Sequence, residues 1–319
     1  MKKWLKRIVY ILLVFFVLLN IMCAFHAYKF THFYADAPKP KQPEQMGFSE
    51  KFSAMLFGIK YGKSKVVDSL TAPHEVVQLK NSDSLRLEAW YLSRAKDSIV
   101  MEKGTVIMFH GHASSKSGII KEAEAFYLMG YNVLMVDFRA HGNSDGNTCT
   151  IGYKESKDVK AAYDYIVAKN EKNIVLWGIS MGASTILKTI SDYEEVKPSK
   201  VILEMPFGSL NNAVEGRVKM MGLPKQPIST LLAFWGGTEQ GFWALGFKPW
   251  NYAKKVTCPV LLQWGINDSR VTEKETNHIM DNLASTNKTL VKYENSKHES
   301  LCINEHDKWV MSVSSFLEK

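Results

Sequence analysis

The chain has 319 residues, of which 46% are apolar, enough for one large domain with a substantial core plus an extension. Its formal net charge is +8, and Lys2, Lys3, Lys6 and Arg7 supply four of these charges. The remaining cations are dispersed, with no basic block interleaved with aromatic residues, so we expect no nucleic-acid partner.

An apolar segment follows these N-terminal cations. The segment from Trp4 to Phe25 is 22 positions long, sufficient to cross a bilayer with a hydrocarbon core of ~30 Å. The preceding cations predict a cytoplasmic N-terminus, with the remaining chain on the extracytoplasmic side of the cell membrane. A cleaved signal peptide is the alternative. The small residues Ala24 and Ala27 have the wrong spacing for a cleavage site, which favours an uncleaved anchor.

The next part of the chain predicts a tether and then a hairpin. Residues 26–50 are polar and contain three prolines, which is typical of a linker. Residues 51–70 predict a short helix, and 75–80 with 85–93 predict a β-hairpin. We therefore divide the chain into an anchor (1–25), a linker with an N-terminal extension (26–74) and a main domain (75–319).

From Gly104 onward, apolar strand-like runs alternate with helical patterns. The predicted strands are 104–109, 131–136, 172–177, 200–204, 259–264 and 288–293, and the helices between them include 116–129, 153–169, 182–193 and 271–284. This alternation is typical of an α/β fold. With the hairpin it predicts a mostly parallel, eight-stranded sheet covered by helices on both faces.

The most informative motif is Gly178-Ile179-Ser180-Met181-Gly182, a G-x-S-x-G sequence between a strand and a helix. Such a turn is a nucleophile elbow, in which flanking glycines relieve crowding around a strained serine. The alternative is a glycine-rich turn with a solvated serine. The motif alone does not decide between them, because a serine hydrolase also requires a base and an acid, which are expected after the serine.

Two residues meet that requirement in the expected order, acid and then histidine. Asp268 follows the strand 259–264, and His298 follows the strand 288–293. Separately, Asp268 could cap a helix near Val271, and His298 could be a solvated loop residue. Because Ser180, Asp268 and His298 follow three strand ends in the order of a catalytic triad, we interpret them as nucleophile, acid and base.

An oxyanion hole would come from two backbone N–H groups. One belongs to Met181, and the other belongs to the loop after strand 104–109, at His112 or alternatively at Ala113. Gly111 would let this loop pass close to a substrate carbonyl. We interpret the His110 side chain as structural.

These motifs resemble the α/β-hydrolase superfamily. The matching residues are His110-Gly111, Asp137 to Ser144, Gly178 to Gly182, Gly265 to Asp268, and His298. Within the superfamily, the chain is most similar to bacterial membrane-anchored hydrolases of the serine-aminopeptidase-like group, and the resemblance covers about residues 75–319. It implies that Asp137, Arg139 and His141 are structural, with Ala140 in place of the usual glycine.

The resemblance also implies a lid over the nucleophile at about residues 206–249. This lid segment is rich in aromatic residues, including Trp235 and Trp243, which we expect to pack on the body and in part to line an acyl pocket. Gly236 and Gly237 are candidate hinge residues.

Together these features predict a serine hydrolase that cleaves carboxylic ester, thioester or lipid acyl bonds through an acyl-enzyme. No cofactor or metal is expected, and the partners are a small-molecule or lipid acyl substrate and the membrane. The alternatives are a serine peptidase or amidase with the same triad, and a catalytically silent membrane-tethered binding protein. Free cysteines are expected, although an extracytoplasmic Cys149–Cys302 disulfide is conceivable.

Overall fold

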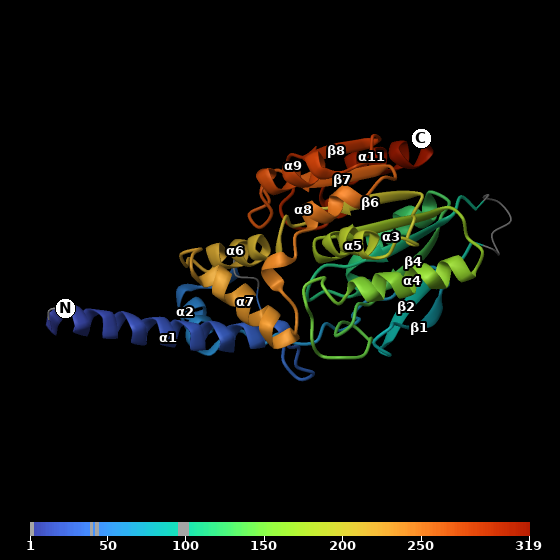
Figure 1. Cartoon of the computed structure of the whole chain (residues 1–319). Helices are drawn as coiled ribbons and strands as arrows, with labels where there is room; N and C mark the ends of the chain where they lie inside the picture. Colours follow the sequence, from blue (N-terminus) through green and yellow to red (C-terminus); the bar gives the residue numbers. More distant parts are fainter. Residues whose placement is uncertain (1–2, 39–40, 42–44, 95–101) are drawn as a thin grey trace.

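The computed structural model describes residues 3–38, 41, 45–94 and 102–319. Its centre is an eight-stranded sheet in the order β1-β2-β4-β3-β5-β6-β7-β8 (Figure 1). The strands are β1 (Glu75–Lys80), β2 (Arg86–Leu92), β3 (Thr105–Phe109), β4 (Asn132–Val136), β5 (Ile174–Ile179), β6 (Lys200–Glu204), β7 (Val260–Gly265) and β8 (Lys288–Tyr293). Among the strand pairs of the described residues, only β1–β2 and β2–β4 are antiparallel, so the predicted mostly parallel α/β sheet is confirmed.

Helices cover both faces of this sheet, which is why β3 to β7 are apolar along nearly their whole length. The pairs α4–α5 and α5–α8 pack together on one face, whereas α3 and α11 meet on the other through Phe126 and Trp309. The helices are α3 (Ile120–Leu128), α4 (Ser156–Ala168), α5 (Met181–Asp192), α8 (Pro249–Tyr252), α9 (Glu273–Asn282), α10 (Leu301–Asn304) and α11 (His306–Glu318). The short 3₁₀ helices are η2 (Lys116–Ile119), η3 (Ala244–Gly246) and η4 (Ala253–Lys255).

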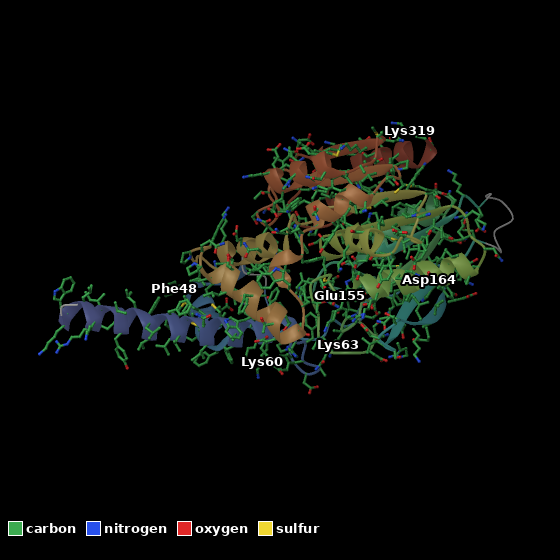
Figure 2. The ribbon with its side chains drawn as sticks, in the orientation of Figure 1. Phe48, Lys60, Lys63, Glu155, Asp164 and Lys319 are labelled. Carbon is green, nitrogen blue, oxygen red and sulfur yellow. The ribbon has the colours of Figure 1, made fainter. Side chains whose placement is uncertain are left out.

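The N-terminal helix α1 (Lys3–Thr31) is 29 residues long, and by length and composition it can cross a membrane. Its N-terminal half projects away from the rest of the molecule, with side chains pointing outward all around it (Figure 2). The helix continues past Phe25, so the prediction of a linker beginning at residue 26 was wrong. Residues 26–31 remain helical because Ala27 and Thr31 are buried against the lid segment. The next helix, α2 (Phe48–Phe57), begins before the predicted residue 51 and ends well before residue 70.

The lid segment contains α6 (Leu210–Met220) and α7 (Ile228–Gln240), and α7 lies along the C-terminal half of α1 (Figure 1). A Cβ atom at Gly236 would lie 3.8 Å from Ala27 Cβ and 3.7 Å from Thr31 Cγ2. Small residues therefore allow the two helices to approach closely. Gly236 and Gly237 both lie inside α7, where Gly236 faces α1 and a Cβ atom at Gly237 would lie 2.6 Å from the carbonyl oxygen of Phe242.

All four cysteines are free, so a Cys149–Cys302 disulfide does not form. The Cys149 sulfur lies 3.7 Å from the Met181 sulfur, whereas the Cys302 sulfur lies 3.8 Å from His306 Nδ1. The two thiols pack into different parts of the core.

Glu204, the last residue of β6, carries a fully buried carboxyl group. Its Oε1 accepts hydrogen bonds from the indole N–H groups of Trp177 (2.9 Å) and Trp309 (2.6 Å). Burial, together with the nearby Glu122, raises the pKa of Glu204 to about 8, against the opposing effect of the two indoles.

This raised pKa predicts a pH-dependent stability. The folded protein retains the Glu204 proton up to about pH 8, whereas the unfolded chain releases it near pH 4.5. The free energy of unfolding should therefore fall as pH rises through this window, by up to ~1.4 kcal/mol per pH unit from this group. Glu204→Gln, which stays neutral, should flatten the dependence measured by denaturant unfolding at pH 5 to 8.5. Glu318→Gln at the exposed C-terminus is the control, and parallel profiles for Glu204→Gln and the wild type would contradict the assignment.

Candidate active site

The turn between β5 and α5 has the geometry of a nucleophile elbow. Ser180 adopts φ 54° and ψ −111°, a conformation that non-glycine residues rarely adopt. A Cβ atom at Gly178 would lie 2.6 Å from the carbonyl carbon of Gly182, and one at Gly182 would lie 2.2 Å from the carbonyl oxygen of Phe109. Both flanking positions therefore require glycine, and the turn presents Ser180 at the carboxyl edge of the sheet.

The structure brings together the three side chains predicted to form a triad. Ser180 Oγ lies 2.8 Å from His298 Nε2, and His298 Nδ1 lies 2.6 Å from Asp268 Oδ2. The Asp268 side chain is fully buried and that of His298 is 12% exposed. Because a carboxylate only accepts hydrogen bonds, His298 Nδ1–H donates to Asp268, which leaves Nε2 free to accept the serine proton.

The second carboxylate oxygen of Asp268 holds its own loop. Oδ1 accepts the backbone N–H groups of Arg270 (2.7 Å) and Val271 (2.9 Å). The alternative that Asp268 caps the following helix is wrong, because α9 begins at Glu273 and is capped by the Thr272 hydroxyl. The two oxygens of Asp268 thus have separate partners, the histidine and the loop backbone.

The loop after β3 passes beside the serine, where a Cβ atom on Gly111 would lie 3.7 Å from Ser180 Cβ. The N–H of Ala113 donates to His141 Nε2 (3.1 Å), whereas none of the described residues accepts the N–H of His112. The N–H of Met181 is at the first position of α5, where a helix offers no internal acceptor. His112 and Met181 thus retain backbone donors next to the serine.

Buried neutral histidines fix these loops. Burial lowers the pKa of His110 to about 4 and that of His141 to about 3. His110 accepts the N–H of Phe138 (3.2 Å) and His141 accepts that of Ala113, which requires uncharged rings.

The motif from Asp137 to Ser144 is also structural. The Asp137 carboxylate accepts the backbone N–H of Lys116 (2.7 Å) and pairs with its ammonium group. Arg139 pairs with the buried Asp158 (2.7 Å). Ala140 has φ 63°, the left-handed conformation that explains the glycine of the family pattern.

Sequence reasoning missed the surroundings of the His112 side chain. Its ring stacks on Phe30 of α1, with centroids 4.9 Å apart, and contacts the ring of Phe33 at 5.4 Å. Arg217 of α6 donates to His112 Nδ1 (3.2 Å). The end of α1 and the lid segment therefore both contact His112, the residue after Gly111 in the loop beside the serine, and no periodicity in the sequence indicates this contact.

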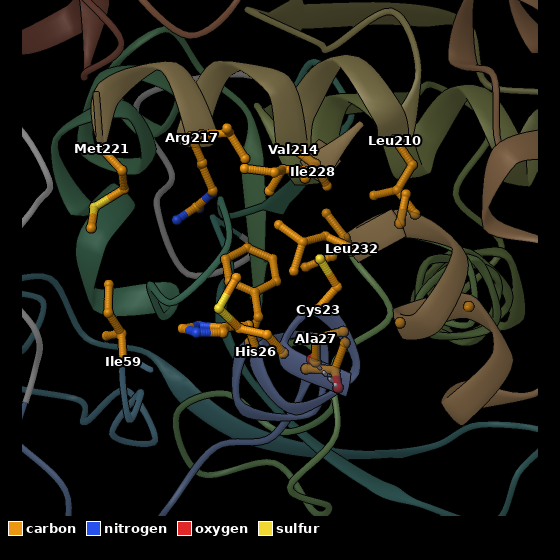
Figure 3. A pocket seen from close by; sticks show the side chains of 18 of the residues that line it. Cys23, His26, Ala27, Ile59, Leu210, Val214, Arg217, Met221, Ile228 and Leu232 are labelled. Carbon is orange, nitrogen blue, oxygen red and sulfur yellow. Dashed lines mark hydrogen bonds between the residues drawn. The ribbon is translucent and has the colours of Figure 1, made fainter. Parts of the chain in front are cut away.

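An apolar cavity of about 200 Å³ lies between α1, α2, α6 and α7 (Figure 3). Of the aromatic residues in the lid segment, Phe242 lines this cavity, whereas neither Trp235 nor Trp243 does. Trp235 instead donates its indole N–H to Asn20 of α1 (3.1 Å), and Trp243 is 61% exposed.

Within the described ranges, no group of three or more His, Cys, Asp or Glu side chains could hold a metal ion.

Residues 101–235 match the family described as serine aminopeptidase, S33. The structure also superimposes on the Pyrococcus furiosus esterase Pf2001 with a TM-score of 0.67 and 25% identity, covering 80% of this chain and 96% of the esterase. The chain belongs to the α/β-hydrolase superfamily. This membership, expected from the motifs, means that the protein is a hydrolase by family.

Curated relatives within the superfamily are distant. The uncharacterized protein YqkD of Bacillus subtilis is 25% identical over 217 residues, covering 67% of this chain and 71% of YqkD. The lysophosphatidylserine lipase ABHD12 of Xenopus tropicalis is 25% identical over 169 residues, covering 49% of this chain but only 41% of the lipase. The chain thus spans less than half the length of that lipase.

Proposed function

We propose that this hydrolase cleaves carboxylic esters through an acyl-enzyme, with Ser180 as nucleophile, His298 as base and Asp268 as the acid that orients it. The observation that supports this most directly is the continuous pair of hydrogen bonds from Ser180 Oγ to His298 and from His298 to Asp268.

In the proposed reaction, Ser180 Oγ bonds to the carbonyl carbon while its proton passes to His298 Nε2. The carbonyl oxygen becomes an oxyanion that accepts the N–H groups of Met181 and His112. The ester C–O bond then breaks and the leaving alkoxide takes the proton from Nε2. Water, deprotonated by the same nitrogen, releases the acid and restores the serine.

An ester is favoured over the free amino terminus that an aminopeptidase would bind. Among the described residues that line the apolar cavity, none carries a carboxylate that could pair with an ammonium group. Arg217, which also lines the cavity, adds a positive charge there. The esterase and lipase among the relatives agree with this choice.

The proposed location is the cell membrane, with α1 as a single-pass anchor. Lys3, Lys6 and Arg7 at its start favour a cytoplasmic N-terminus and an extracytoplasmic catalytic domain.

A fluorophosphonate probe tests the proposal, because it phosphonylates only activated serines. We expect stoichiometric labelling of the detergent-solubilised full chain, with the modified peptide containing Ser180. Heat-denatured protein is the control for non-specific labelling. A folded chain that stays unlabelled would instead indicate the catalytically silent binding protein.

A further inference from the structure

The cavity between α1 and the lid segment is unusual in that the apolar N-terminal helix forms one of its walls. Met22, Cys23 and Ala27 line it from α1, and Leu210, Val214 and Leu232 line it from α6 and α7. In Figure 3 the side chains of α6 point across the cavity toward α1. The lining is almost entirely hydrocarbon, so an apolar ligand is the chemistry that it fits.

His112 and Met181, which carry the backbone donors beside the serine, do not line the cavity themselves but lie just behind its wall. Arg217 lines the cavity and bonds the ring of His112. Thr150 and Ile151 also line it, and they follow Cys149, whose sulfur contacts Met181. The wall of the cavity therefore contacts His112 directly through Arg217, and only Cys149 separates it from Met181.

The other end of the cavity lies near the expected membrane surface. A helix needs ~20 residues to cross a hydrocarbon core of ~30 Å. If the membrane-spanning part of α1 begins at Arg7, it therefore ends close to Ala27. The lining residues of α1 thus fall at the outer edge of the bilayer. Helix α2 lies beside this part of α1 and exposes Phe48, whose position is labelled in Figure 2, as well as Phe52 and Phe57. Exposed aromatic residues are typical of a membrane interface.

We propose that the cavity binds the acyl chain of a membrane lipid ester, and that the anchor helix is itself part of the substrate site. This inference rests on the proposed function. An acyl chain leaving the outer leaflet would pass along α1 into the cavity without crossing water, with its ester carbonyl at Ser180.

The test uses two fluorophosphonates that differ only in their alkyl chain, butyl or dodecyl, on the full chain in phosphatidylcholine nanodiscs. Leu232→Trp fills the cavity, and the ratio of the dodecyl to the butyl labelling rate at Ser180 should fall about tenfold or more, because several methylenes lose their apolar contacts. Leu231→Trp, the same change one residue earlier and outside the lining, should retain the wild-type ratio.

Met22→Trp repeats the test from α1, with Leu18→Trp, one turn earlier and outside the lining, as its control. It also covers the case in which Leu232→Trp does not fold. A lowered ratio in Met22→Trp but not in Leu18→Trp supports the anchor helix as a wall of the site. Unchanged ratios in both cavity variants, or equal losses in the controls, would overturn the acyl-chain inference alone. A wild-type chain labelled by neither probe would overturn the proposed function itself.

Discussion

Ser180→Ala is expected to lower kcat for p-nitrophenyl ester hydrolysis by about 10⁴- to 10⁶-fold, because it removes the hydroxyl oxygen that would attack the carbonyl carbon. The hydroxyl lies 2.8 Å from His298 Nε2, so its loss also removes the hydrogen bond that holds the imidazole over the elbow. The residual rate would come from the backbone donors and from substrate binding.

Two measurements keep this result interpretable. The circular dichroism spectrum and the unfolding midpoint of Ser180→Ala should stay close to those of the wild type, because alanine preserves the Cβ that the elbow already accommodates. Ser191→Ala, near the far end of the same helix α5, should keep full activity. Substantial turnover by Ser180→Ala would refute the nucleophile assignment.

Asp268→Asn is expected to lower kcat by about 10⁴-fold although it changes a single atom. The backbone N–H groups of Arg270 and Val271 both donate to Asp268 Oδ1, so an asparagine side chain would place its oxygen there. Its NH₂ group would then face His298 Nδ1. The imidazole would have to accept at Nδ1 and carry its proton on Nε2, where it can no longer take the proton of Ser180.

This loss should appear in kcat with a smaller change in KM, since the tautomer affects proton transfer and not the substrate contacts. Asp281→Asn on the exposed surface of α9 is the matched control and should behave as the wild type. Activity within about tenfold of wild type in Asp268→Asn would show that Asp268 does not orient the histidine.

The local features of the site follow from short-range patterns. Glycines at 178 and 182 are recognisable because a sharp strand-to-helix turn leaves no room for a Cβ, a constraint that acts over five residues. Asp268 and His298 could be located because each follows a strand, and parallel strands bring their carboxyl ends to one edge of the sheet. The strand runs were equally clear, since a strand covered on both faces is apolar throughout.

The surroundings of the site could not be predicted in this way. The helical continuation of α1 through residue 31 depends on packing against α7, and the bond from Gln240 to Thr31 joins residues 209 positions apart. The contact of Arg217 with His112 spans 105 positions. Neither periodicity nor a motif indicates such contacts, because they depend on how helices from distant parts of the chain pack against one another.

The sequence by itself determined the α/β sheet, the elbow and the order of the three polar residues at its edge, because each depends on backbone geometry within a few residues or on the rule for parallel strands. Only the tertiary structure decided that the apolar N-terminal helix joins the lid segment around a cavity, that the tryptophans of that segment lie outside it, and that the cysteines remain apart. These outcomes depend on side-chain packing between distant segments, where small residues such as Ala27 and Gly236 set the distance between helices.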